Sequence, residues 1–142
     1  MLKAVLDSNV LISGTIVAKG MPFELLKAWR EGEWELIMSP QILEEVRRVL
    51  TLLRISRGYP LTDQEISDLI RLLTHRTILV SGILTIPRTS RDIEDDHVLA
   101  CAKEGHANYI VSGDQDLLSL TRFEGIPIVT PAAFGAILKA GG

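Results

Sequence analysis

Short apolar runs of the kind found in buried strands alternate with helix-like stretches along the whole chain. The runs that we predict to be strands are Lys3–Leu6, Leu36–Met38, Ile78–Val80, Tyr109–Val111 and Ile128–Val129, and Ile83–Ile86 is a less strand-like run. The predicted helices are Phe23–Arg30, Pro40 to about Leu53, Asp63 to about His75, Glu94–Glu104, a short helix ending near Leu120, and a terminal helix from Pro131. Such alternation is typical of a parallel sheet with helices on both faces. We therefore predict an α/β fold with three α/β/α layers and a central, mainly parallel sheet.

Several helix boundaries are marked by residues that favour helix ends. Ser39 followed by Pro40 is typical of a helix start, because serine caps free N–H groups and proline fits the first turn. Thr62 and Glu65 have the spacing of a capping box. Gly105 follows the predicted helix Glu94–Glu104 and is expected to end it.

Length and composition predict one domain spanning residues 1–142, because 142 residues with 46% hydrophobic content suffice for one buried core. No apolar run approaches the roughly 18 to 20 residues that cross a bilayer. The N-terminal stretch also lacks a small-residue cleavage site, so we expect a soluble, cytoplasmic protein without a membrane partner. A single cysteine, Cys101, excludes an internal disulfide and a cysteine-rich zinc site. A bound metal would therefore need oxygen ligands.

The net charge of −3 lacks the basic surplus that is typical of nucleic-acid-binding proteins. Basic side chains are nevertheless concentrated in one helical segment, which contains Arg47, Arg48, Arg54 and Arg57. These arginines are either a path for RNA or a solvated helix face, and the sequence leaves both interpretations open.

Two aspartates follow predicted strands, where parallel α/β sheets bind their ligands. Asp7 comes directly after the first strand, and Asp114 follows the strand Tyr109–Val111 after a short turn. Ligands of such sheets lie beyond the carboxyl ends of the strands. A single aspartate in this position is commonly a helix cap or a turn former, but two on separate strands favour a site.

Helical geometry separates adjacent acids in two predicted helices, because each residue advances about 100° around the axis. Glu45 flanks the apolar stripe of its helix, whereas Glu44 points towards solvent. Asp95 projects close to the centre of the apolar stripe of its own helix, and Asp96 lies more than about 100° away. We therefore expect Glu45 and Asp95 to face the protein.

These four acids, Asp7, Glu45, Asp95 and Asp114, are expected to converge without a basic residue at equivalent positions. The helix N-terminus alone could explain Asp95, because its positive end stabilises an acid. It does not explain the convergence of four carboxylates, which repel one another unless a cation lies between them. A hard divalent cation is the natural partner of such an oxygen cluster.

Four motifs in the same order resemble those of PIN domains. They are Asp7-Ser8-Asn9-Val10, Ser39-Pro40 leading to Glu45, Asp92-Ile93-Glu94-Asp95-Asp96 before Val98, and Ser112-Gly113-Asp114-Gln115-Asp116-Leu117-Leu118. The ending Ile128–Phe134 fits the same family, so the resemblance covers nearly the whole length. Each motif alone is weakly specific, but four in order are fairly specific. More narrowly, the chain resembles the PIN-type (VapC-like) toxin components of type II toxin–antitoxin systems.

The resemblance implies a PIN-like fold and a Mg²⁺- or Mn²⁺-dependent endoribonuclease that hydrolyses RNA phosphodiester bonds. It implies that Asp7, Glu45, Asp95 and Asp114 are catalytic and bind the metal, with Asp116 as a further, less regular ligand. Asn9 and Ser112 match polar positions that orient the acids or contact phosphate. An antitoxin protein and a second copy of the chain are the expected protein partners.

Two other functions remain open from the sequence. In a phosphatase or phosphotransferase that forms an aspartyl phosphate, Asp7 would be the nucleophile. Against this alternative, Asn9 stands where such enzymes usually carry a second acid, and no lysine follows a late strand. In a non-enzymatic α/β binding module, the acids would only cap helices.

Overall fold

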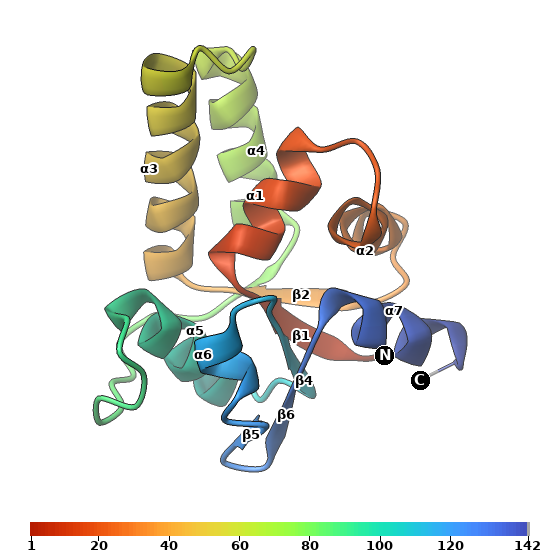
Figure 1. The fold of residues 1–142 in the computed structure, drawn as a ribbon. Helices are drawn as coiled ribbons and strands as arrows, with labels where there is room; N and C mark the ends of the chain where they lie inside the picture. Colours follow the sequence, from red (N-terminus) through yellow and green to blue (C-terminus); the bar gives the residue numbers. More distant parts are fainter. Residues whose placement is uncertain (142) are drawn as a thin grey trace.

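A computed structural model describes residues 1–141 of the protein, and its centre is a six-stranded sheet with the strand order β3-β2-β1-β4-β6-β5 (Figure 1). In chain order the elements are β1 (Lys3–Leu6), α1 (Ser8–Ile16), α2 (Met21–Arg30), β2 (Glu35–Met38), α3 (Pro40–Arg57), α4 (Asp63–His75), β3 (Ile78–Leu79), α5 (Ile93–Glu104), β4 (Tyr109–Val111), α6 (Gln115–Leu118), β5 (Arg122–Phe123), β6 (Ile126–Val129) and α7 (Pro131–Lys139). The predicted three-layer α/β fold with a mainly parallel sheet is confirmed.

The sheet is parallel from β3 to β6, and only the edge strand β5 runs antiparallel to its neighbour. Leu6 of β1 lies opposite Val111 of β4, so these two strands end at the same level. The backbone N–H of Asp7 continues this ladder by donating to the carbonyl oxygen of Val111 at 3.0 Å. The register therefore places Asp7 beside Ser112, the residue that follows Val111.

Apolar side chains of the central strands form the core together with the inner faces of the helices. Leu6, Ile37 and Ile110 are fully buried, and α5 packs across β1, β2 and β4. The edge of Trp34 meets the ring of Phe134 with centroids 5.2 Å apart, which ties the start of β2 to α7. Figure 1 shows α3 and α4 side by side as a helical hairpin that projects away from the sheet.

Most of the predicted elements occur, with changes at their ends. The capping box is present, because the hydroxyl of Thr62 accepts from the N–H of Glu65 while the Glu65 carboxylate accepts from the N–H of Thr62. Helix α3 runs beyond the predicted end near Leu53 to Arg57, where Gly58 adopts a left-handed conformation with φ 63°. Within residues 1–141, no helix combines the length and apolar character that crossing a bilayer requires.

Two elements of the structure were not predicted from the sequence. Helix α1 has no recognisable helical period, because Val10, Leu11, Ile12 and Gly14 are all buried. The edge strand β5 has only two residues. The apolar run Ile83–Ile86 forms no strand, and the exposed fraction of Ile83 is 83%.

Candidate functional site

Asp7 lies at the carboxyl end of β1 and caps α1, and both of its carboxylate oxygens accept hydrogen bonds. The backbone N–H of Val10 donates to Oδ1 at 2.9 Å, and the hydroxyl of Ser112 donates to Oδ2. Only 4% of Asp7 is exposed. Burial raises the pKa of Asp7, the bonds from Ser112 and Val10 oppose this rise, and the negative charge of Asp114 adds to it.

Ser112 connects Asp7 to the loop that carries the next acid. Its side chain is fully buried, donates to Asp7, and accepts the backbone N–H of Asp114 at 2.9 Å. Asp114 in turn caps the short helix α6 by accepting the N–H of Asp116 at 2.9 Å. This chain of hydrogen bonds fixes the loop after β4 against the end of β1.

Three carboxylates converge at this edge of the sheet. Asp95 from the first turn of α5, Asp114 and Asp116 each present an oxygen, and these oxygens all lie within 4.8 Å of one another. The exposed fraction is 7% for Asp95 and 44% for the Asp116 side chain, so the cluster opens to solvent on the Asp116 side. We call these three residues the acid cluster.

The electrostatics of the acid cluster favour a cation. Burial first, and then the nearby charge of Asp114, raise the pKa of Asp95 to about 7, although the Ser90 hydroxyl, donating at 3.2 Å, opposes the rise. Oxygen ligands at such spacing match the preference of hard divalent cations. A bound cation would relieve the repulsion that keeps Asp95 protonated, so these residues fit a divalent metal site.

Glu45 is not a member of the acid cluster, but it lies near Glu94, the residue that precedes Asp95. The Ser8 hydroxyl donates to Oε2 of Glu45, and Arg48 approaches Oε1 at 3.6 Å. Burial raises the pKa of Glu45, the bond from Ser8 opposes the rise, and the carboxylate of Glu94 adds to it. Ser8 and Glu94 therefore contribute to the candidate site, although no role was predicted for either from the sequence. The position of Glu94 was predictable, because it precedes Asp95 and projects about 100° away from it around the helix, towards α3.

Asp96 departs from the expectation that only Asp95 would be covered. Asp96 is 4% exposed, because the loop before α5 folds over it. It accepts the N–H of Ser90 at 2.7 Å and pairs with Nε of Arg88 at 3.0 Å. The helical angle correctly separated the two aspartates but could not reveal this loop. Asp96 is therefore a buried anchor of the loop outside the acid cluster.

An open cleft of about 600 Å³ continues from Asp114 between α1, α6 and the start of α7. Asn9, Ser13 and Gln115 line it with polar side chains. Asn9 is exposed there, as a residue that contacts substrate would be.

The four arginines are spread along α3, and only Arg48 pairs with an acid predicted for the site. Arg47 pairs with Glu44 at 3.8 Å, and Arg54 pairs with Asp63 of α4 at 2.8 Å. Arg57 ends the helix about 18 Å along the axis from Glu45, at about 1.5 Å per residue.

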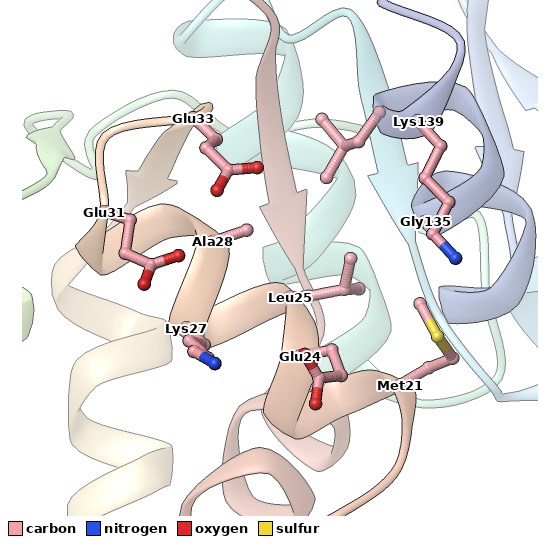
Figure 2. A pocket seen from close by; sticks show the side chains of 10 residues that line it. Met21, Glu24, Leu25, Lys27, Ala28, Glu31, Glu33, Gly135 and Lys139 are labelled. Carbon is pink, nitrogen blue, oxygen red and sulfur yellow. The ribbon is translucent and has the colours of Figure 1, made fainter.

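Two other features do not offer comparable chemistry. A cavity of about 210 Å³ lies between α2 and α7 (Figure 2). Its lining includes Leu25, Ala28, Lys27, Glu31 and Lys139 but none of the predicted site acids. Burial raises the pKa of the Cys101 thiol to about 12, which leaves it protonated and unreactive at neutral pH.

Comparison with known proteins agrees with this geometry. The chain is 28% identical over 123 residues to the uncharacterized protein MJ1680 of Methanocaldococcus jannaschii, an alignment that covers 84% of this chain and 75% of the relative. The profile of the PIN domain matches residues 3–116, a range that includes every acid of the site. The chain therefore belongs to the PIN domain family, whose members are generally metal-dependent nucleases.

Proposed function

We propose that this protein is an endoribonuclease that hydrolyses RNA phosphodiester bonds with Mg²⁺ or Mn²⁺ held by its carboxylates. The observation that carries the proposal is the acid cluster, in which Asp95, Asp114 and Asp116 present oxygens within 4.8 Å of one another. The raised pKa of Asp95 supports a cation there, because the cluster is electrostatically unfavourable without one.

The predicted acids and polar residues each have a role in this proposal. Asp95, Asp114 and Asp116 would hold the metal directly, and Asp7 and Glu45 would add negative charge. Ser112 orients Asp7 and the Asp114 loop through its two hydrogen bonds. Asn9 lines the cleft, where it would contact a substrate phosphate. When bound, the metal would activate water and offset the charge that develops on the leaving oxygen.

The aspartyl-phosphate alternative is less consistent with the structure. A nucleophilic aspartate needs an oxygen that can reach substrate, whereas Asp7 is 4% exposed and both its oxygens accept hydrogen bonds. Asp7 is therefore better suited to holding the site together than to attacking phosphorus.

The decisive experiment is cleavage of structured and single-stranded RNAs by wild type, Asp95→Asn and Asp68→Asn, each with Mn²⁺, Mg²⁺ or excess EDTA. Asp68 is an exposed acid of α4 and serves as the matched control. We expect metal-dependent cuts by wild type and Asp68→Asn that Asp95→Asn loses. Cleavage that survives both EDTA and Asp95→Asn would contradict the proposal.

A measurement of metal affinity distinguishes the nuclease from the non-enzymatic binding module. A metal-dependent nuclease should show a Mn²⁺-dependent rise in melting temperature that Asp7→Asn and Asp95→Asn reduce. No Mn²⁺ response together with no cleavage would favour the non-enzymatic module.

We further propose that the protein is the toxin of a toxin–antitoxin system, acts as a homodimer and binds an antitoxin protein. This part rests on the resemblance to VapC-like toxins, and the projecting α3–α4 hairpin is the proposed surface for the second copy or the antitoxin. Expression of wild type should arrest growth, and Asp95→Asn should not. Light scattering after size exclusion measures the oligomeric state. A monomer at micromolar concentration would contradict the homodimer.

A further inference from the structure

The loop before α5 is held rigidly, although it lies at the surface beside the acid cluster. The buried carboxylate of Asp96 accepts the backbone N–H groups of Thr89 at 3.3 Å and Ser90 at 2.7 Å. The Ser90 hydroxyl then donates to Asp95 at 3.2 Å. The loop therefore has a fixed position relative to the acid cluster.

Arg88 and Asp96 together clamp this loop, with Nε and Nη2 of Arg88 directed at the loop itself. The Nε of Arg88 lies 3.0 Å from Oδ2 of Asp96, and its Nη2 donates to the carbonyl oxygens of Ser90 at 3.1 Å and Arg91 at 2.7 Å. Arg88 thus holds the backbone of Arg91 in place from within the loop.

The side chain of Arg91 is more exposed than that of Arg88 and reaches Asp116, the most exposed member of the acid cluster. It is 90% exposed, and its Nη2 lies 3.5 Å from Oδ1 of Asp116. An exposed ion pair of this kind contributes little to stability, because water screens both charges. Arg91 can therefore exchange Asp116 for another anion at little cost.

A polyanionic substrate must approach several carboxylates at this edge of the sheet, and like charges oppose that approach. A guanidinium group beside the cluster offsets the repulsion and can donate two parallel hydrogen bonds to one phosphate. When Asp116 takes part in cation binding, its charge is shared and its hold on Arg91 weakens.

We propose that Arg91 is a substrate-binding residue that leaves Asp116 and binds a phosphate of the RNA strand next to the acid cluster. The inference rests on the proposed nuclease function. It adds to that function the residue that brings the RNA backbone to the acids. It also gives the pair of the buried Asp96 with the exposed Arg88 the role of positioning Arg91.

The test compares wild type, Arg91→Gln, Arg91→Lys and Arg71→Gln in binding a 2′-O-methyl single-stranded RNA, whose integrity under each condition is checked on a denaturing gel. Arg71 is the matched control, because it is also exposed, with a pair to Asp68 at 3.7 Å. Fluorescence anisotropy at several salt concentrations, with EDTA and with Mn²⁺, gives the affinity and its salt dependence. Circular dichroism checks the fold of each variant.

We expect Arg91→Gln to weaken RNA binding roughly tenfold and to reduce the salt slope by about 0.7, the value for one phosphate contact on a single strand. Arg91→Lys should retain the slope, and Arg71→Gln should match wild type. With cleavable RNA, Arg91→Gln should raise KM more than it lowers kcat.

Two outcomes would overturn the inference. RNA binding by Arg91→Gln that equals that of Arg71→Gln would exclude a phosphate contact. A rise in Mn²⁺ affinity with unchanged RNA binding would show that Arg91 only neutralises Asp116. Wild type that neither binds nor cleaves RNA would instead refute the proposed function, and Arg91 with it, so the two failures are distinguishable.

Discussion

Asp95 is the residue whose charge state most directly couples folding to the site. Burial and the charge of Asp114 raise the pKa of Asp95 from 3.8, the value of a free side chain, to about 7 in the folded protein. Between these values the folded state holds a proton that the unfolded state has lost, so this carboxyl makes stability fall as pH rises through that window. We predict that wild type in EDTA loses stability from pH 4 to pH 7 more steeply than Asp95→Asn.

Chemical unfolding of both proteins across this range measures the effect. A tenfold change in proton affinity corresponds to about 1.4 kcal/mol, which such experiments resolve. Mn²⁺ should restore wild-type stability at pH 7, because it binds only the folded site. Equal pH dependence in wild type and Asp95→Asn would contradict the burial and repulsion assigned to Asp95.

Ser112 is a second residue whose loss can be predicted. Replacement by alanine leaves the Asp7 carboxylate buried without one donor and the N–H of Asp114 without its acceptor. We expect Ser112→Ala to lower the free energy of unfolding by about 1 to 3 kcal/mol and to reduce metal-dependent cleavage. Ser119→Ala, at an exposed serine that ends the following helix α6, is the control and should change neither. If Ser112→Ala changes neither stability nor cleavage, the link that Ser112 makes between Asp7 and Asp114 is dispensable.

Helices and strands could be predicted from the sequence where residues close together in the chain mark them. The starts of α3 and α4 were predictable, because Ser39, Pro40, Thr62 and Glu65 mark them within a few residues. Asp7 and Asp114 were predictable as neighbours, because parallel strands end at one edge. Helix α1 was not, because it is buried on most sides and lacks an amphipathic pattern. The pairing of Ser8 with Glu45 and the loop over Asp96 were not either, because they depend on how distant segments meet.

The close packing of α1 against α2 depends on Gly14. A Cβ at this position would lie 2.7 Å from the carbonyl oxygen of Pro22, and that backbone cannot move as a side chain can. We predict that Gly14→Ala lowers the free energy of unfolding by about 1 to 3 kcal/mol. Gly135→Ala is the control, because its Cβ would meet only the flexible end of Met21. Equal stability of the two variants would show that α1 and α2 can separate without cost.

The loop that carries Arg91 should depend on Asp96. Removing this carboxylate takes away the partner of Arg88 and the acceptor of two backbone N–H groups. We expect Asp96→Ala to lower the free energy of unfolding by about 1 to 3 kcal/mol, measured by urea unfolding. Glu44→Ala, which removes an exposed pair with Arg47, should stay within about 0.5 kcal/mol of wild type. An unchanged free energy of unfolding in Asp96→Ala would contradict the role of Asp96 and Arg88 in holding the loop.

Across the whole molecule, charge is arranged with acids at the carboxyl edge of the sheet and arginines along the projecting hairpin. The cleft beside Asp114 and the guanidinium of Arg91 lie at the acid site, whereas Arg57 lies far along α3. An RNA strand long enough to reach both regions would contact the hairpin arginines, and a short one would not. RNA length therefore separates the two parts of the proposed path.

The four hairpin arginines are not equivalent, and the last prediction depends on this difference. Arg54 is paired with Asp63 at 2.8 Å across α3 and α4, so Arg54→Gln should lower stability more than RNA affinity. Arg48 pairs with the site acid Glu45 at 3.6 Å, so it is left unchanged. The double variant Arg47→Gln and Arg57→Gln should keep the fold, weaken binding of a long RNA and reduce its salt slope by about 0.7 per lost phosphate contact. Binding of a short RNA that covers only the acid site should change little in the double variant, whereas Arg91→Gln should weaken both. Anisotropy with RNAs of two lengths measures this contrast. An unchanged salt slope for the long RNA would mean that the hairpin arginines form a solvated helix face and that the strand leaves the acid site by another route.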